Sequence, residues 1–213
     1  MTIVRESALT SRPLYEFSKR VLDVSLALVA LILASPIFIL VAIAVRCSSR
    51  GCILFRQTRV GRYGRPFTCL KFRTMVMDAE RMLADDPELT AEFVNAYKLR
   101  RDSRVTRVGC ILRKLSLDEL PQLWNILRGE MSVVGPRPVL AEELSTMYGP
   151  AASRVVSVRP GLTGLWQVSG RCDTGYEERV ELDLSYVERR SLLLDLWIIA
   201  RTPVALLTMR GAH

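Results

Sequence analysis

Residues 24–45 read VSLALVALILASPIFILVAIAV, a stretch that is apolar except for Ser25, Ser35 and the break at Pro36. At a rise of about 1.5 Å per residue, a helix of this length could just cross a hydrocarbon core of roughly 30 Å. The stretch therefore indicates attachment to a membrane, and its path through the lipid decides the class of fold.

A cleaved signal peptide is the first interpretation of this stretch, because Ala42-Ile43-Ala44 resembles a cleavage site. The apolar run is too long for a typical signal peptide, however, and Arg46 and Arg50 follow it directly. A simple transmembrane helix is the second interpretation, and the length of the run permits it.

A re-entrant helix, which enters and leaves the same face of the membrane, is the third interpretation. Pro36 removes a backbone donor and kinks a helix, and Ser35 can satisfy the carbonyl group that is freed. Both flanks are basic, which favours the cytoplasm for both ends; the residues are Arg12, Lys19 and Arg20 before the stretch, and Arg46, Arg50 and Arg56 after it. Prolines also occur in spanning helices, so the pattern leaves the second and third interpretations open.

The composition of the chain limits the classes of molecule that it is expected to bind. Its 213 residues carry a formal net charge of +8, which suits nucleic acid, anionic lipid headgroups or phosphorylated substrates. Nearly all the basic residues are arginine, which binds phosphate in a bidentate fork. His213 is the only histidine, which argues against a histidine-based triad. The cysteines are odd in number and scattered, which argues against a disulfide framework and a zinc site; they are Cys47, Cys52, Cys69, Cys110 and Cys172.

An acidic pair, Asp118-Glu119, follows the basic pair Arg113-Lys114 in this otherwise basic chain. Adjacent carboxylates among cations suggest a site for a metal ion and a phosphorylated substrate. A structural alternative remains, because Ser116 with Glu119 three residues later fits a capping box at the start of a helix over residues 116–127, ended by Gly129.

The remaining pattern predicts a small mixed α/β region. Residues 52–55 and 67–70 are expected to be strands on either side of a turn-rich stretch, residues 61–66. Helices are expected over residues 75–89, interrupted at Asp86-Pro87, and over residues 139–148. Residues 186–207, with Trp197 and several arginines, are typical of an interfacial amphipathic helix that Pro203 bends or ends; an ordinary core-facing helix fits the pattern equally well.

Five motifs in order resemble the bacterial sugar transferase family, the monotopic phosphoglycosyl transferases, from about residue 19 to residue 207. They are the apolar segment broken at Ser35-Pro36, Lys71-Phe72-Arg73-Thr74-Met75, Ser116-Leu117-Asp118-Glu119-Leu120-Pro121-Gln122-Leu123, Gly135-Pro136-Arg137-Pro138, and Arg159-Pro160-Gly161-Leu162-Thr163-Gly164 with Gln167 and Gly170-Arg171. The resemblance implies an α+β fold with four parts. These are a basic segment over residues 1–20, a re-entrant membrane helix over residues 21–46, a small mixed α/β cytoplasmic catalytic domain over residues 47–185, and an interfacial amphipathic segment over residues 186–213. Larger members of the family carry a long N-terminal transmembrane bundle. The resemblance implies that this chain is instead the catalytic unit alone, or nearly so.

The resemblance implies transfer of a sugar 1-phosphate from a nucleotide sugar, usually a UDP-sugar, to polyprenyl phosphate, with Mg²⁺ as cofactor. Asp118 is then the nucleophile that carries a covalent phosphosugar, and Glu119 its partner, both close to the metal. Substrate contacts are expected from Arg113, Arg137, Arg171, Arg159, Lys71, Arg73 and Gln167. The enzyme is expected at the bacterial inner membrane with its catalytic domain on the cytoplasmic face, as a first membrane step of polysaccharide or glycoconjugate assembly. A homo-oligomer is left open.

Two alternatives compete with this interpretation. A non-enzymatic basic membrane protein that binds anionic lipid would explain the charge and the apolar run, but not the acidic pair beside Arg113. A nucleotide-sugar phosphodiesterase would use water as the acceptor in place of the lipid. Nucleic acid is not an expected partner, because aromatic residues make up 7% of the chain and are not interleaved with the basic ones.

Overall fold

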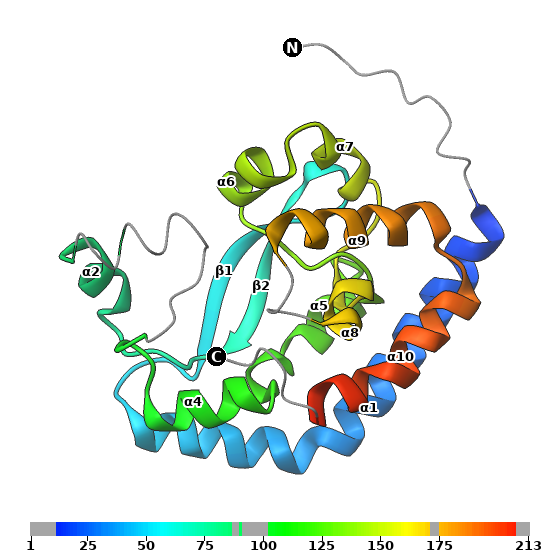
Figure 1. Ribbon diagram of the computed structural model, residues 1–213. Coiled ribbons are helices and arrows are strands. Elements are labelled where there is room, and N and C mark those ends of the chain that lie inside the picture. The colour runs from blue at the N-terminus through cyan, green and yellow to red at the C-terminus, as the bar shows by residue number, and fades with distance from the viewer. Residues whose placement is uncertain (1–11, 87–89, 91–101, 171–174, 208–213) are drawn as a thin grey trace.

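The computed structural model describes residues 12–86, 90, 102–170 and 175–207. The first part of a long N-terminal helix and a C-terminal helix lie next to each other along one side of a small domain of short helices and two small sheets (Figure 1). In chain order the elements are α1 (Pro13–Ser48), β1 (Leu54–Val60), β2 (Pro66–Phe72), α2 (Ala79–Ala84), α4 (Arg107–Lys114), the 3-10 turn η2 (Leu117–Glu119), α5 (Gln122–Arg128), β3 (Ser132–Val134), α6 (Ala141–Glu143), the π-turn η3 (Leu144–Tyr148), α7 (Ala152–Val155), β4 (Gly161–Thr163), α8 (Leu165–Ser169), α9 (Tyr176–Arg189) and α10 (Leu192–Leu207). The predicted α+β class is confirmed.

Each of the two sheets consists of two short strands. Strands β1 and β2 form an antiparallel hairpin in which Leu54 pairs with Phe72 and Val60 with Pro66. The predicted turn lies between them, but β1 begins and ends later than residues 52–55. Strands β3 and β4 pair in parallel, and their close approach requires glycine, because a Cβ on Gly161 would lie 2.1 Å from the nitrogen of Gly135. This pairing brings the Pro136-Arg137-Pro138 loop beside the loop that follows β4.

Helix α1 runs without interruption through Ser35 and Pro36, so the predicted break is a bend within one helix. Figure 1 shows α1 descending beside α10 and then changing direction to run beneath α4. Pro36 has no N–H to offer the carbonyl of Ile32, and the Ser35 hydroxyl donates to that oxygen instead, at 2.8 Å. The predicted role of Ser35 in satisfying a freed carbonyl is confirmed.

Both ends of α1 contact the same small domain. Near its start, the Glu16 carboxylate forms a bidentate ion pair with Arg62 at 2.9 and 3.1 Å. At its end, Arg73 donates to the carbonyls of Ser49 and Arg50. A straight helix of 36 residues would measure about 54 Å, so the bend allows both ends to reach one domain.

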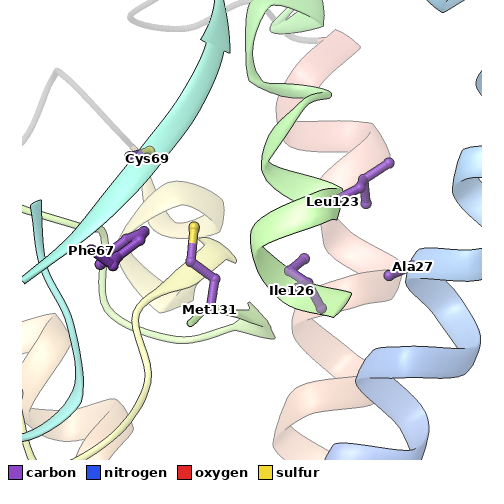
Figure 2. Packing of buried hydrophobic residues seen from close by; sticks show 6 residues of the cluster. All are labelled: Ala27, Phe67, Cys69, Leu123, Ile126 and Met131. Carbon is purple, nitrogen blue, oxygen red and sulfur yellow. The ribbon is translucent and has the colours of Figure 1, made fainter. Parts of the chain in front are cut away.

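The core lies where α1 meets this domain. Ala27 of α1 faces Leu123 and Ile126 of α5, and Phe67 and Met131 lie beyond them (Figure 2). Elsewhere α1 is exposed. Of an apolar stretch of 18 residues within it, only 11% is buried in the protein, and the length and composition of the helix suffice to cross a membrane. A helix so apolar and so exposed is accounted for by contact with lipid.

Helix α10 also has two faces. Asp195 and Ile198 are buried, and Asp195 accepts from Lys19 Nζ at 2.9 Å, from the Tyr15 hydroxyl at 3.0 Å and from the Tyr186 hydroxyl at 2.8 Å. The opposite face exposes large apolar side chains, namely Leu193, Leu196, Trp197, Val204 and Leu207. The predicted amphipathic helix is confirmed, although it begins at residue 192 rather than 186 and continues through Pro203.

Candidate active site

The acidic pair lies on a tight turn between α4 and α5. Ser116 has φ 54° and ψ 22°, in the left-handed region that non-glycine residues seldom adopt. The 3-10 turn η2 follows and carries both carboxylates, and α5 begins only at Gln122. The predicted capping box is therefore wrong, because the Ser116 side chain caps no backbone group of the turn that follows it; the predicted end of the helix at Gly129 is correct.

Asp118 is the most buried acid of this turn, with 7% of its surface exposed. Among the described residues its carboxylate has no hydrogen-bond or ion-pair partner. Burial raises the pKa of Asp118 above its ordinary value of 3.8, and the adjacent charge of Glu119 raises it further. Lys71, Arg113 and Arg137 act in the opposite direction. Within the part of the chain that the structure describes, the carboxylate is thus unpaired, and it is close to three cations.

Glu119 holds two of those cations. Its Oε1 accepts from Lys71 Nζ at 2.7 Å and from Arg137 Nη2 at 3.2 Å. Lys71 comes from the end of β2, whereas Arg137 follows β3 and stands between two prolines. The predicted site residues Lys71, Arg137, Asp118 and Glu119 are therefore brought together from three separate parts of the chain.

Arg113 approaches the pair from the last turn of α4. Its Nε donates to the Thr74 hydroxyl at 3.0 Å. Burial lowers the pKa of Arg113, and the negative charge of Asp118 opposes that shift. The guanidinium is thus oriented by Thr74 and lies within electrostatic reach of the Asp118 carboxylate.

A continuous cavity of about 3010 Å³ contains these groups. Its polar part is lined by Lys71, Arg113, Asp118, Glu119 and Arg137, and its apolar part by Phe38 and Ile39 of α1 with Ile199, Pro203 and Leu206 of α10. Ordinary small-molecule pockets measure about 300–1,000 Å³, so this cavity has room for a large ligand or for two. The cavity therefore extends from the charged site to the apolar side chains of α1 and α10.

Three other predicted residues have different surroundings. Arg73 lines the cavity, but its guanidinium binds backbone carbonyls at the end of α1. Arg159 lies outside the cavity lining, where its Nε donates to the Gly129 carbonyl at 2.9 Å. Gln167 lines the cavity with 5% of its surface exposed, and its amide atoms have no hydrogen-bond partner within the described part of the chain. Arg171 lies outside the described residues.

A second polar cluster lies in the cavity wall and was not predicted from the sequence. Arg59, Glu143, Tyr176 and Arg179 line the cavity next to Arg137 and contact one another. They are spread over 121 residues of the chain, and none belongs to a recognisable motif. Only the position of Glu143, shortly after the Pro136-Arg137-Pro138 loop, could have pointed to it.

The acidic pair is compatible with Mg²⁺. Among the described residues no group of three or more His, Cys, Asp or Glu side chains could hold a metal ion. Mg²⁺, however, is commonly bound through one or two carboxylates together with substrate phosphates and water. The partner-free carboxylate of Asp118 beside Glu119 matches that ligand set.

Fold and site together define a membrane-associated enzyme that acts on phosphorylated substrates at the lipid surface. The chain belongs to the bacterial sugar transferase family, which it matches over residues 14–209, and it is accordingly a phosphoglycosyl transferase. It is 50% identical over 206 residues to the exopolysaccharide production protein ExoY of Sinorhizobium fredii, covering 95% of this chain and 91% of that one.

Two further relatives carry more specific names. The UDP-glucose:undecaprenyl-phosphate glucose-1-phosphate transferase of Caulobacter vibrioides is 44% identical over 207 residues, covering 93% of this chain and 73% of the relative. The undecaprenyl-phosphate galactose phosphotransferase of Salmonella typhimurium is 43% identical over 201 residues, covering 92% of this chain and 42% of the relative. The names of both relatives describe transfer of a sugar phosphate to a polyprenyl phosphate.

Proposed function

We propose that this protein transfers a sugar 1-phosphate from a UDP-sugar to polyprenyl phosphate, with release of UMP, as a first membrane step of polysaccharide or glycoconjugate assembly. The observation that carries the proposal is the partner-free carboxylate of Asp118 among Lys71, Arg113 and Arg137 in a cavity that continues between apolar helices. The names of the relatives support the same reaction.

Asp118 acts as the nucleophile in this scheme. A carboxylate oxygen forms a bond to the sugar-bearing phosphorus, the bond from that phosphorus to the bridging oxygen breaks, and UMP leaves. An oxygen of polyprenyl phosphate then forms a bond to the same phosphorus. The bond between this phosphorus and the Asp118 oxygen breaks, which restores the free carboxylate. Lys71, Arg113 and Arg137 offset the negative charge of the two phosphate groups throughout.

Asp118 and Glu119 are the residues that would hold Mg²⁺. The ion would supply further positive charge to a diphosphate that a carboxylate must approach. Glu119 has a second task in this chain, because its carboxylate forms ion pairs with Lys71 and Arg137 and so holds both cations in place.

The apolar part of the cavity is the proposed entrance for the acceptor. A polyprenyl tail lies in the bilayer with its phosphate at the surface, and the side chains of α1 and α10 that line the cavity are suited to contact with the tail. The phosphate would then approach Asp118 from the membrane side, while the soluble nucleotide sugar enters from the aqueous side.

We also propose that α1 is re-entrant and that the catalytic domain lies on the cytoplasmic face of the inner membrane. Both ends of α1 bind the same domain through polar contacts, Glu16 with Arg62 and Ser49 with Arg73. A hydrocarbon core of roughly 30 Å between those ends would separate one pair from the domain. Basic residues on both flanks favour the cytoplasm.

Single-cysteine labelling tests this topology. In a cysteine-free background, Arg12→Cys and Arg50→Cys should both be protected from an impermeant thiol reagent outside intact cells and both react after lysis. A cysteine placed in an outward-facing loop of a known membrane protein serves as the positive control. Labelling of one of the two positions in intact cells would show that α1 spans the membrane.

The reaction itself is tested by measuring UMP release across a panel of UDP-sugars, with and without polyprenyl phosphate. We expect release that depends on the lipid and stops in excess chelator, since Mg²⁺ offsets the diphosphate charge. Equal release without the lipid would identify a phosphodiesterase instead. Absence of release with every donor would leave a lipid-binding protein. Activity in excess chelator would remove the metal from the scheme.

A further inference from the structure

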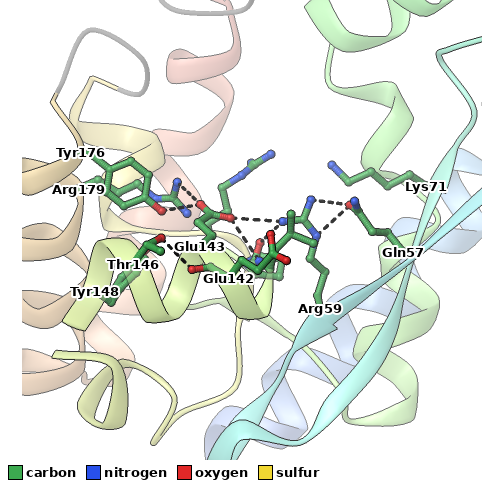
Figure 3. A network of polar contacts seen from close by, with 12 residues as sticks. Gln57, Arg59, Lys71, Glu142, Glu143, Thr146, Tyr148, Tyr176 and Arg179 are labelled. Atoms are coloured by element: carbon green, nitrogen blue, oxygen red, sulfur yellow. Dashed lines mark hydrogen bonds and ion pairs between the residues drawn. The ribbon is translucent and has the colours of Figure 1, made fainter. Parts of the chain in front are cut away.

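Four groups from three parts of the chain converge on the buried carboxylate of Glu143 (Figure 3). Its Oε1 accepts from the Tyr176 hydroxyl and from Arg179 Nη1, the latter at 3.0 Å. Its Oε2 accepts from the backbone nitrogen of Leu140 at 3.2 Å and lies 3.6 Å from Arg59 Nη1. With 5% of its surface exposed, Glu143 is a buried anion shared by two arginines.

One route from this carboxylate leads to the backbone on either side of Pro138. Arg59 Nη1, which Glu143 attracts, donates to the Pro138 carbonyl at 3.3 Å. Glu143 itself holds Leu140 N, and the carbonyl of Val139 accepts from Val60 N at 3.0 Å. The chain directly after Arg137 is therefore fixed at three successive residues.

A second route leads to the side chain of Arg137. The guanidinium of Arg179, held by Glu143, lies 4.9 Å from the ring centroid of Trp166. The guanidinium of Arg137 lies 6.0 Å from the centroid of the same ring. Trp166 is thus positioned between the cluster and the Arg137 side chain, which also contacts Glu119.

We infer that Glu143 is a positioning residue that places Arg137 for the diphosphate of the nucleotide sugar. Its negative charge keeps Arg59 and Arg179 together in the cavity wall, and those two arginines fix Arg137 from its backbone and from its ring neighbour. A cation held in its binding position loses less freedom when the anion arrives, which strengthens binding. The inference rests on the proposed function, since it takes a nucleotide sugar as the ligand of Arg137.

The test is Glu143→Gln, which retains the shape and an oxygen acceptor but removes the charge. We expect the KM for the UDP-sugar to rise roughly tenfold, equivalent to about 1.4 kcal/mol, while kcat changes little. Glu142→Gln is the matched control, because it removes the same charge from the neighbouring acid, which is exposed. The KM of this variant should equal that of the wild type.

A double-mutant cycle separates positioning from a general loss of structure. If Glu143 acts through Arg137, Glu143→Gln should add no further rise in KM to an Arg137→Ala background. A KM for Glu143→Gln equal to that of the wild type, or effects of the two substitutions that multiply, would overturn the inference.

Removal of a buried countercharge can prevent folding, so a second variant keeps the test decisive. Trp166→Leu interrupts the second route while leaving the charges around Glu143 in place, and its effect on KM should also vanish in the Arg137→Ala background. Binding of UDP, measured by calorimetry, reports the same coupling without turnover. The proposed function can thus fail, through absence of UMP release by the wild type, independently of this inference.

Discussion

Asp118→Asn is expected to abolish UMP release and, at neutral pH, to make the folded protein more stable than the wild type. The amide cannot form the phosphosugar intermediate, because it lacks a nucleophilic carboxylate oxygen. The same substitution removes a charge whose burial is unfavourable, since the Asp118 carboxylate is 7% exposed and has no hydrogen-bond partner among the described residues. A simple loss of folding would instead lower activity and stability together.

The pH dependence of stability follows from the raised pKa of Asp118. The folded state binds the proton of Asp118 more tightly than the unfolded state does. The stabilisation that this proton gives to the folded state is therefore fully present below about pH 3.8, the ordinary pKa of the group. It is lost as the pH rises through the higher pKa of the folded state. The stability advantage of Asp118→Asn over the wild type should therefore grow as the pH rises from acidic to neutral.

Thermal unfolding in detergent at acidic and neutral pH, followed by tryptophan fluorescence, measures this difference. Wild-type activity should also decline on acidification at a pH above 3.8, because the nucleophile must be ionised. Near-wild-type turnover by Asp118→Asn would show that another group carries the phosphosugar. Equal stability of the two proteins at all pH values would contradict the buried, partner-free environment.

Asp195→Ala is expected to destabilise the fold by about 3–5 kcal/mol, because it leaves the charge of Lys19 without its buried partner. The Tyr15 hydroxyl loses its carboxylate acceptor at the same time, whereas the Tyr186 hydroxyl can still donate to the Val134 carbonyl, at 3.1 Å. Since Asp195 joins α10 to the start of α1, the two helices should separate more readily. The free energy of unfolding in detergent, measured by denaturant titration, quantifies the effect.

Asp85→Ala is the matched control for this change. Asp85 also forms an ion pair, with Arg81 at 3.5 Å, but 70% and 82% of the two side chains are exposed. Exposed pairs contribute little to stability, so this variant should unfold like the wild type. Equal losses in the Asp85 and Asp195 variants would show that the buried pair has no special role in joining the helices.

The sequence predicted best those elements that are determined by residues close together in the chain. The apolar run, Pro36 with Ser35 before it, and the turn over residues 61–66 act through neighbouring residues, and the structure contains a bent α1 and a hairpin there. The boundaries were less accurate. Helix α1 begins at Pro13 because polar residues such as Lys19 bind partners more than 100 residues away, which no hydropathy pattern can reveal.

The site could be predicted in part for the same reason. The cations that surround the acidic pair, Lys71 and Arg137, lie in motifs of the chain, and the structure brings them to Glu119. Arg73 and Arg159 are in similar motifs, yet their guanidinium groups bind backbone carbonyls. The sequence does not distinguish an arginine that completes the fold from one that remains available to substrate.

The docking of α1 has a consequence for the order in which the protein is made. Asp23 of α1 is buried and accepts from the Ser132 hydroxyl at 3.0 Å and from Val133 N at 2.9 Å, so α1 forms one wall of the catalytic domain. During synthesis the N-terminal part of a chain is available to fold first, and α1 leaves the ribosome long before β3 and α5 exist. The catalytic domain must therefore fold against a helix that has already been made. We expect that a folded form of this domain without α1 does not accumulate in the cell.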